Sequence, residues 1–141
     1  MNIKFFYDGI KFRVRKAGEI KRFLGRVITE KKKLPGDLNF IFTTDDTILG
    51  INREFLNHNY YTDVISFDFS TGKELNYEIY ISIDTLKRNA SYYKVSMNEE
   101  LIRVMIHGIL HLCGYDDSDD DERDKMFTRQ ESLVKEFKRS I

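Results

Sequence analysis

The residues best suited to chemistry lie in the segment HGILHLCGYDD at residues 107–117. Its histidines, His107 and His111, are four positions apart, so on a helix they lie about 40° apart in azimuth and about 6 Å apart in rise. Both imidazoles can therefore bind one metal ion. Gly114 allows the left-handed backbone that ends a helix, so the chain can turn back and bring Asp116 or Asp117 over the same face. The segment predicts a metal site of two histidines and one carboxylate.

The chemistry of such a site follows from the number of its ligands. Three protein ligands leave a position open for water, and a zinc ion lowers the pKa of that water from about 16 to about 7, which makes hydroxide available at neutral pH. An isolated HxxxH pair is more often two helix residues with ordinary hydrogen bonds, but the apolar helix, the glycine stop and the acidic turn together favour a metal. Cys113 lies about 200° around the helix from His111, so we expect it to point away from the metal as a small core residue.

Gly108 narrows the choice of reaction. Zinc peptidases with the HExxH motif carry a general-base Glu directly after the first histidine, and Gly108 occupies that position here. The chain therefore lacks the usual general base for peptide hydrolysis at this position. A phosphodiester is different, because the metal can both supply hydroxide and neutralise charge on the phosphoryl oxygens. The sequence therefore favours nuclease chemistry, with a zinc peptidase as a weaker alternative.

The composition is that of a packed globular protein. The chain has 141 residues, of which 41% are hydrophobic and 33% charged, and these values predict one domain over residues 1–141 with a buried core. A single cysteine cannot form an intramolecular disulfide and excludes a cysteine-rich metal site. No apolar run approaches the roughly 20 residues of a membrane helix, and the start of the chain lacks the features of a signal peptide. We therefore expect a cytoplasmic protein without membrane attachment.

The beginning of the chain is basic, although the net charge of the whole is zero. Residues 1–36 contain eleven Lys and Arg against three acidic residues, a net charge of +8 that leaves −8 for the remainder. A basic lobe of this kind suits a polyanion such as RNA, although a charged run is more often a solvated face. The candidate RNA-binding residues are Lys11, Arg13, Arg15, Lys31, Lys32 and Lys33.

Apolar periodicity predicts the elements that must position these residues. Apolar runs indicate strands at residues 3–7, 38–42, 63–69 and 77–81, and the turn-forming residues between the last two indicate a hairpin. Helical spacing indicates helices at residues 17–32, from Thr44 to about residue 56, at residues 82–94 and from Ser96 to Gly114, followed by a final helix that runs nearly to the end. This order predicts an α+β fold with a small mixed sheet of about four strands, packed with helices, and a metal site on a helix of the C-terminal half.

Two further expectations concern a turn and a buried face. The segment Leu34-Pro35-Gly36 is strong turn punctuation and should separate the first helix from the second strand. The apolar residues of the last helix should form its buried stripe, namely Met126, Phe127, Leu133, Val134 and Phe137.

The strand near residues 62–67 offers polar side chains to the metal helix. Alternation places Val64 and Ser66 on one face of the strand, with Asp63 on the other, so Ser66 or Asp63 can face a substrate or support a ligand. A plain core strand with polar ends is the alternative. His58 lies in a loop with two tyrosines, where solvent exposure is the simpler expectation, although those tyrosines suit stacking on unpaired bases.

The same segments resemble a known family, the YbeY-type bacterial endoribonucleases of ribosomal RNA maturation. The family signature HGxLHLxGYDH is reproduced from His107 to Asp116, and the chain departs from it at Asp117. A second family block, Thr-Asp/Asn-Val-Leu-Ser-Phe, is present as TDVISF at residues 62–67. The resemblance extends over about residues 37–127, whereas the first thirty-six residues match only in the order of their elements.

The resemblance implies a metal-dependent endoribonuclease, specific for single-stranded RNA, that acts on the small ribosomal subunit in maturation of the 3′ end of 16S ribosomal RNA and in ribosome quality control. It implies one zinc ion per chain, bound by His107, His111 and, where the family has a third histidine, Asp117; an oxygen donor there also suits iron or manganese. The candidate catalytic residues are His107, His111 and Ser66. The family often has an Arg at the position of Leu56, so a non-catalytic RNA-binding assembly factor with a structural metal stays a second interpretation.

Overall fold

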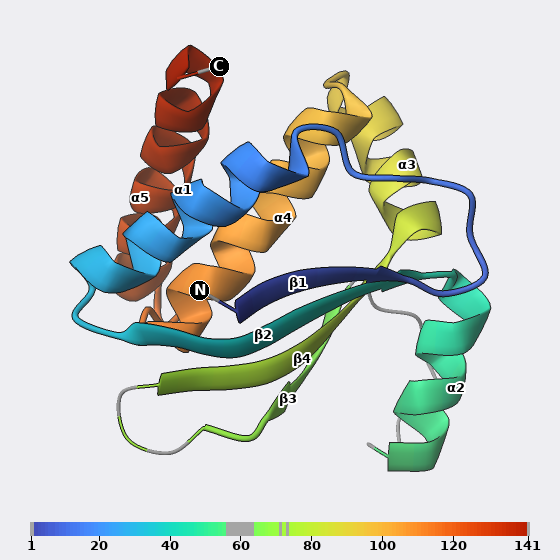
Figure 1. The fold of residues 1–141 in the computed structure, drawn as a ribbon. Helices are drawn as coiled ribbons and strands as arrows, with labels where there is room; N and C mark the ends of the chain where they lie inside the picture. The colour runs from blue at the N-terminus through green and yellow to red at the C-terminus, as the bar shows by residue number, and fades with distance from the viewer. Residues whose placement is uncertain (1, 56–63, 71, 73, 141) are drawn as a thin grey trace.

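A computed structural model describes residues 2–55, 64–70, 72 and 74–140 (Figure 1). In chain order its elements are β1 (Asn2–Tyr7), α1 (Ala17–Glu30), β2 (Leu34–Thr43), α2 (Asp45–Phe55), β3 (Val64–Asp68), β4 (Glu74–Ser82), α3 (Ile83–Tyr93), α4 (Met97–Leu112) and α5 (Asp120–Ser140). The strands form a sheet in the order β1-β2-β4-β3. Strand β2 pairs in parallel with β1 and β4, and β3 pairs antiparallel with β4, as expected of a hairpin. The predicted α+β fold with a mixed sheet of four strands is therefore confirmed.

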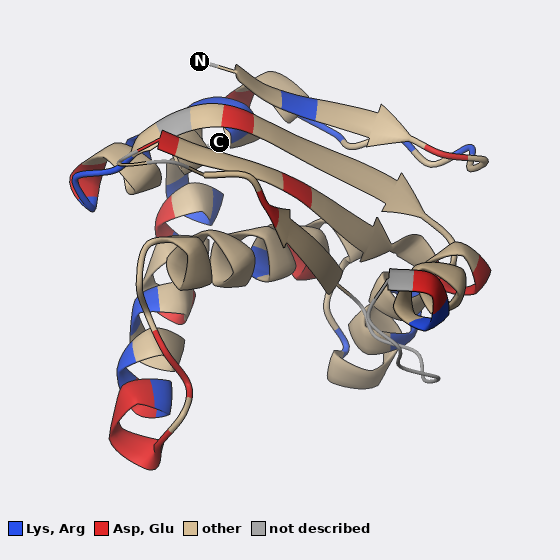
Figure 2. Cartoon of the chain, turned by 90° about the horizontal axis from the view of Figure 1, so that it is seen from below, with Lys and Arg blue, Asp and Glu red and all other residues tan. Residues whose placement is uncertain are grey.

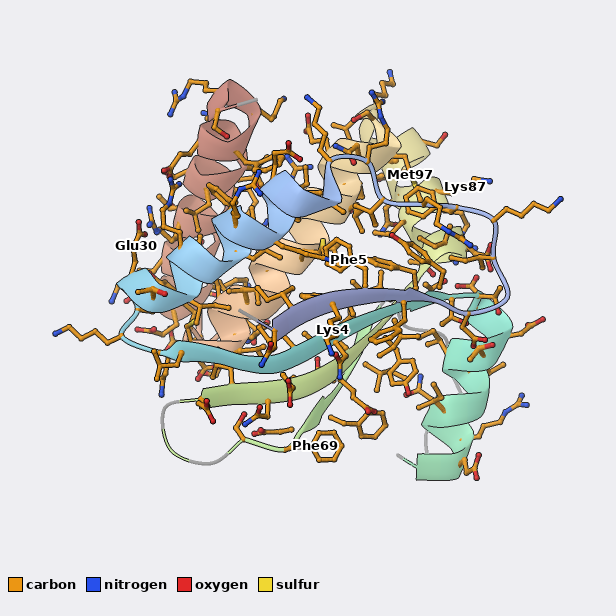
Figure 3. All side chains as sticks on the ribbon, in the orientation of Figure 1. Lys4, Phe5, Glu30, Phe69, Lys87 and Met97 are labelled. Atoms are coloured by element: carbon orange, nitrogen blue, oxygen red, sulfur yellow. The ribbon has the colours of Figure 1, made fainter. Side chains whose placement is uncertain are left out.

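The core lies between the sheet and the helices above it in Figure 1. Helices α1 and α4 lie over one face of the sheet and α5 packs beside α4, whereas α2 lies on the other side of the sheet. Alternation along β2 directs Leu38, Phe40 and Phe42 toward the helices, and all three side chains are buried. Figure 3 shows that side chains such as Phe5 fill this space, while Phe69 lies at the opposite face of the sheet.

Serine caps begin the two helices that lead to the candidate site. The hydroxyl of Ser82 accepts a hydrogen bond from Thr85 N (3.2 Å) at the start of α3, and that of Ser96 accepts one from Glu99 N (3.0 Å) at the start of α4. Each cap satisfies a backbone donor that the first turn of a helix leaves free. The helix starts predicted at these serines are thus confirmed.

Two local predictions are wrong. Strand β2 already begins at Leu34, so Leu34-Pro35-Gly36 is part of the strand, with a register shift between Pro35 and Leu38. At this irregularity Gly36 lies close to the side chain of Asn76, and a Cβ at this position would collide with the amide of Asn76, so the strand needs a glycine there.

The second correction concerns Phe127, which is 61% exposed instead of buried. The buried stripe of α5 consists of Met126, Gln130, Leu133, Val134 and Phe137. Phe127 follows Met126 by one residue, which is about 100° around the helix, so it faces away from that stripe. None of the helices in the described part of the chain is long and apolar enough to cross a membrane.

Candidate metal centre

Helix α4 carries both histidines on the stripe that faces solvent. The opposite side of this helix is apolar and buried, through residues that include Met105, Ile106 and Ile109. His107 and His111 are separated by one turn, with their ring centroids 4.8 Å apart and their planes nearly perpendicular. The buried side of α4 thus fixes the helix against the core, and the helical repeat brings the two imidazoles together as the sequence predicts.

A tight turn follows α4 and reverses the chain. The backbone of Gly114 has φ +104°, a conformation that other residues rarely adopt, and Tyr115 N donates to Leu110 O (3.0 Å). Lys31 Nζ donates to the hydroxyl of Tyr115 (2.6 Å) and lies 4.6 Å from the centroid of its ring, which ties the turn to the end of α1. These contacts place the next residues of the chain, beginning with Asp116, beside α4.

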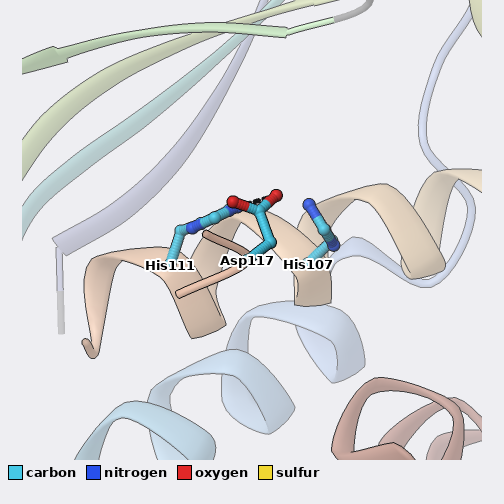
Figure 4. A group of neighbouring side chains, drawn as sticks. All are labelled: His107, His111 and Asp117. Atoms are coloured by element: carbon cyan, nitrogen blue, oxygen red, sulfur yellow. Dashed lines mark ion pairs between the residues drawn. The ribbon is translucent and has the colours of Figure 1, made fainter. Parts of the chain in front are cut away.

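The turn distinguishes the two candidate carboxylates. Asp116 accepts hydrogen bonds from the backbone N–H and the hydroxyl of Ser118, at 3.1 and 2.8 Å, and these bonds hold the pKa of Asp116 below its usual value. The carboxylate of Asp116 thereby stabilises the turn. Asp117 instead faces α4, where its Oδ2 lies 3.6 Å from His111 Nε2. The structure therefore groups Asp117 with the histidines (Figure 4).

The three side chains are close enough to hold one metal ion between them. One donor atom from each of His107, His111 and Asp117 can be chosen so that all three lie within 4.8 Å of one another. Ligands that are 2.0–2.2 Å from a tetrahedral zinc ion are about 3.4 Å apart, close to the distance between His111 and Asp117. The side chains of His111 and Asp117 are 37% and 52% exposed, so the group is open to solvent on one side. That opening suits a catalytic site, in which one coordination position must remain accessible.

His107 has a buried hydrogen-bond partner on α5. Its Nδ1 lies 2.7 Å from Oε1 of Gln130, whose residue is only 7% exposed. Gln130 Nε2 donates to Oε2 of Glu131 (2.9 Å), and Glu131 forms two hydrogen bonds with Arg103 of α4 (2.9 and 3.0 Å). Arg103 also contacts Glu99 (3.1 Å) and Glu100 (3.4 Å). Nδ1 of His107 is thus the last member of a series of polar contacts between α4 and α5. The other ring nitrogen, Nε2, is directed toward the Asp117 carboxylate (Figure 4).

The carboxylates and the arginine of this network shift one another's pKa values. The hydrogen bond from Arg103 lowers the pKa of Glu131, and the one from Lys138 at 2.7 Å lowers the pKa of Glu99. The hydrogen bonds that Arg103 donates to Glu131 and Glu99 in turn raise the pKa of Arg103, although its partial burial opposes this effect. The network therefore links ionised side chains of α4 and α5 by charge-assisted hydrogen bonds.

The histidines line a cleft of about 910 Å³. Helix α4 forms its floor through a stripe that includes Val104, His107 and Gly108, and α3, α5 and β3 contribute the walls. Two aromatic side chains lie on these walls, Tyr93 of α3 and Phe127 of α5, and they are 62% and 61% exposed. Figure 2, in which the sheet is seen from below, shows α5 extending away from α4 with its acidic first turn at the far end.

The other candidate site residues have different surroundings. Ser66 and Val64 of β3 line the cleft, on the face of the strand that alternation predicts. Cys113 packs against the core as expected, and burial raises the pKa of its thiol. Asp63, His58 and Leu56 lie outside the described residues.

The basic residues of the first third fall into two groups. Lys11, Arg13 and Arg15 precede α1 and Lys31, Lys32 and Lys33 follow it. The 14 residues of α1 separate the groups by about 21 Å. Arg13 is engaged within its own loop, where it donates to the carbonyls of Ile10 and Phe12. The second group, Lys31 to Lys33, lies next to the turn that carries Asp117, because Lys31 contacts Tyr115 of that turn. We call this turn, residues 114–117, the metal turn.

Comparison with known proteins agrees with these features. The family model described as endoribonuclease YbeY matches residues 10–138. The chain belongs to the YbeY endoribonuclease family. A relative named endoribonuclease YbeY from Flavobacterium psychrophilum is 43% identical over 135 residues, with 96% of each chain covered, and one from Parabacteroides distasonis is 39% identical over 126 residues, with 89% of each covered.

The similarity to the YbeY family extends further toward the N-terminus than the two sequence motifs indicate, because the match to the family model begins at residue 10. In three dimensions the chain is similar to a Thermotoga maritima protein solved in solution, with a TM-score of 0.67 and 27% identity. That comparison covers 96% of this chain and 88% of the other.

Sequence reasoning missed Gln130, Arg103 and the aromatic walls of the cleft. A signal for Gln130 is visible in the sequence, because it is a polar residue four positions after Met126 and three before Leu133, inside the apolar stripe of the last helix. A polar side chain in such a stripe needs a buried partner. The sequence contains no comparable signal for the partner's identity, which depends on how α5 packs on α4.

Proposed function

We propose that the chain is a metal-dependent endoribonuclease that cleaves single-stranded RNA, with His107, His111 and Asp117 as the metal ligands. The observation that carries the proposal is a group of three suitable donors, two of which line an open cleft, in a chain of the YbeY family. Zinc is the favoured ion because the donors suit four-coordinate geometry, and iron or manganese also accept two histidines and a carboxylate.

The chain's own residues define the mechanism. A bound divalent cation would polarise a phosphate oxygen and lower the pKa of a water ligand. His107 and His111, which line the cleft, would hold that cation together with Asp117 of the turn. Ser66 lies on the wall opposite the α4 floor, where its hydroxyl can donate a hydrogen bond to a phosphate oxygen.

The floor of the cleft disfavours peptide hydrolysis. Gly108, at the position of the general base in HExxH peptidases, lines the cleft, and apart from its chain neighbours and its own helix backbone no atom of the described residues lies within 4 Å of where its Cβ would be. Glu100 and Glu131 also line the cleft, but both are paired with Arg103. A phosphodiester substrate makes less demand on a separate base, because the cation can stabilise charge on the phosphoryl group.

The walls of the cleft support specificity for single strands. Tyr93 and Phe127 expose more than half of their aromatic side chains beside the candidate metal centre. Unpaired bases stack on such side chains, with a contribution of about 1–3 kcal/mol per base, whereas the bases of a duplex are already stacked on one another.

For the biological substrate we propose ribosomal RNA of the small subunit, processed at its 3′ end, with a further role in ribosome quality control. Its support is membership of the YbeY family together with the basic residues on either side of α1. The group that includes Lys32 and Lys33 lies beside the metal turn and is the better placed to contact phosphates near the site. Charge reversal of that group should reduce the dependence of log affinity on log salt by about 0.7 for each phosphate that the protein no longer neutralises.

The deciding experiment measures cleavage of labelled RNA by protein loaded with zinc, manganese or iron. We expect single-stranded RNA to be cut, duplex RNA of the same sequence to be resistant, and unstructured peptides to remain intact. The His111→Ala protein should keep its circular dichroism spectrum and lose cleavage. If the loaded protein binds RNA but cuts none, the catalytic proposal is wrong and a non-catalytic assembly factor with a structural metal replaces it. If His111→Ala cuts as well as the parent, the cleavage does not come from this metal centre and the catalytic proposal is likewise wrong.

A further inference from the structure

Gln130 occupies an unusual place for an amide side chain. It lies in the buried stripe of α5 among Met126, Leu133 and Val134, and only 7% of the residue is exposed. Both of its polar atoms have partners, since Oε1 meets His107 Nδ1 (2.7 Å) and Nε2 donates to Glu131 (2.9 Å). A leucine at this position would satisfy the apolar stripe equally well. The amide therefore needs an explanation beyond packing.

The partners of Gln130 determine which way its amide points. A carboxylate can only accept hydrogen bonds, so the amino group of Gln130 must face Glu131 and its carbonyl oxygen must face His107. Arg103 fixes the Glu131 carboxylate with two hydrogen bonds of 2.9 and 3.0 Å, which prevents the carboxylate from turning away. A flipped amide would lose its hydrogen bond to Glu131 and would place its carbonyl oxygen against that carboxylate.

The orientation of the amide in turn determines the tautomer of His107. A carbonyl oxygen is an acceptor only, so the proton of the neutral imidazole must be on Nδ1. The lone pair is then on Nε2, the ring nitrogen that is directed toward Asp117 in Figure 4. A histidine in this state can bind a cation without first moving its proton to the other nitrogen.

We propose that Gln130 is a positioning residue that holds His107 with its proton on Nδ1 and its Nε2 free for the metal, and that Arg103 and Glu131 fix Gln130 in this role. The inference deepens the proposed function, because it concerns a ligand of the same metal centre. It separates the ligands into two kinds. His107 is oriented before the metal arrives, whereas Asp117 is placed by an exposed turn.

The first measurement needs no metal and no RNA. Long-range nitrogen–proton NMR spectra of the metal-free protein, recorded where the ring of His107 is neutral, distinguish its two neutral tautomers. We expect the Nδ1–H form to dominate in the parent protein. Gln130→Leu should give a mixture of the two forms, and Gln130→Glu should restore the Nδ1–H form, because its carboxylate is also an acceptor.

The second measurement is zinc affinity by competition with a chelator. Loss of a hydrogen-bond partner behind a metal ligand typically weakens binding by about 10–100-fold, which we expect for Gln130→Leu. Gln130→Glu should bind zinc at least as tightly as the parent, since a carboxylate behind a histidine raises its basicity. Ser132→Ala, an exposed change two residues further along α5, is the matched control and should leave the affinity unchanged.

The outcomes separate positioning from packing. If Gln130 were only a packing residue, Gln130→Leu would change the free energy of unfolding without a selective loss of zinc affinity, and Gln130→Glu would be the worse variant. Equal tautomer populations in the parent, or equal zinc affinity in the parent and Gln130→Leu, would overturn the proposal. Neither result depends on RNA cleavage, so an inactive parent protein with the expected tautomer and affinities would contradict the proposed function and leave this inference intact.

Discussion

The candidate metal centre is held from two sides that differ in burial and in the range of their contacts. On the α5 side, His107 is linked through the buried Gln130 to the partly buried side chains of Glu131 and Arg103, a network that comes from two helices. On the turn side, Asp117 is placed by the local geometry that follows Gly114, and its side chain is 52% exposed.

The difference indicates how each side tolerates change. Ionised groups in a partly buried network depend on one another, so removal of one partner leaves the others with an uncompensated charge. An exposed carboxylate can be replaced at little cost to folding, because water solvates whatever is left. The α5 side should therefore couple metal binding to stability, and the turn side should affect metal binding alone.

The largest effect should come from Arg103→Met, which keeps the length of the side chain but removes its charge. Three carboxylates on α4 and α5 then lose the charge of Arg103, although Glu99 keeps its ion pair with Lys138, and the free energy of unfolding should fall by about 3 kcal/mol. Urea unfolding measures this change. The matched control is Arg26→Met, which breaks an exposed ion pair from α1 to Glu136 and should cost less than about 1 kcal/mol. Equal destabilisation of the two variants would contradict the proposed difference in burial.

Asp117 tests the turn side of the comparison. Asp117→Ala removes a ligand, so zinc affinity should fall by at least about 100-fold, equivalent to about 2.7 kcal/mol of binding free energy. Asp117→His supplies another donor and should retain most of the affinity. The unfolding free energy of the metal-free protein should stay within about 0.5 kcal/mol of the parent in both variants. Undiminished zinc binding by Asp117→Ala would show that another donor completes the site.

Gly114→Ala acts on the same side through the backbone. The φ of +104° strains any residue with a Cβ, so stability should fall by about 1–2 kcal/mol and the turn should relax. We expect a weaker zinc affinity than in the parent because Asp117 is displaced from His111. Thermal unfolding and chelator competition on the same samples check both parts, and a loss of stability with unchanged affinity would mean that the turn does not position the carboxylate.

Gly108→Ala separates stability from activity at the cleft floor. Alanine is favoured over glycine inside a helix by about 0.5–1 kcal/mol, and its Cβ would meet no atom of the described residues within 4 Å beyond its own helix backbone and chain neighbours, so the protein should become more stable. The added methyl group lies in the cleft and should reduce RNA cleavage. Gly50→Ala in α2, where the Cβ likewise meets no described residue beyond its own helix backbone and chain neighbours, should raise stability without changing cleavage.

The smallest expected effect is a dependence of stability on acid pH. The pKa values of Glu131 and Glu99 in the folded protein are lowered from the unfolded value of 4.5 by their cationic partners. Their contribution is therefore present above about pH 4.5 and is lost as the pH falls below it. Solvent exposure limits it to about 0.2–1 kcal/mol per pair. Urea unfolding between neutral and acid pH should show this loss in the parent protein and a shallower one in Arg103→Met.

Local patterns in the chain were sufficient to predict the parts of the site that form within one element. The spacing of His107 and His111, the glycine stop and the serine caps act within one or two helical turns, where backbone hydrogen bonds fix the geometry whatever the rest of the chain does. The same holds for the alternation that places Ser66 on the cleft face of β3. Periodicity also sufficed for the α+β class, because each element is long enough to show its own repeat.

The contacts that the site residues make with other elements depend on how the helices pack. Gln130 is 23 residues from His107 in the sequence, and their contact depends on the angle and the register at which α5 packs on α4. Those same variables turn Phe127 into the cleft and out of the core. The length of α1 likewise divides the basic residues into two groups. Helix packing is set by many small contacts between surfaces that are distant in sequence, and a local pattern contains none of that information.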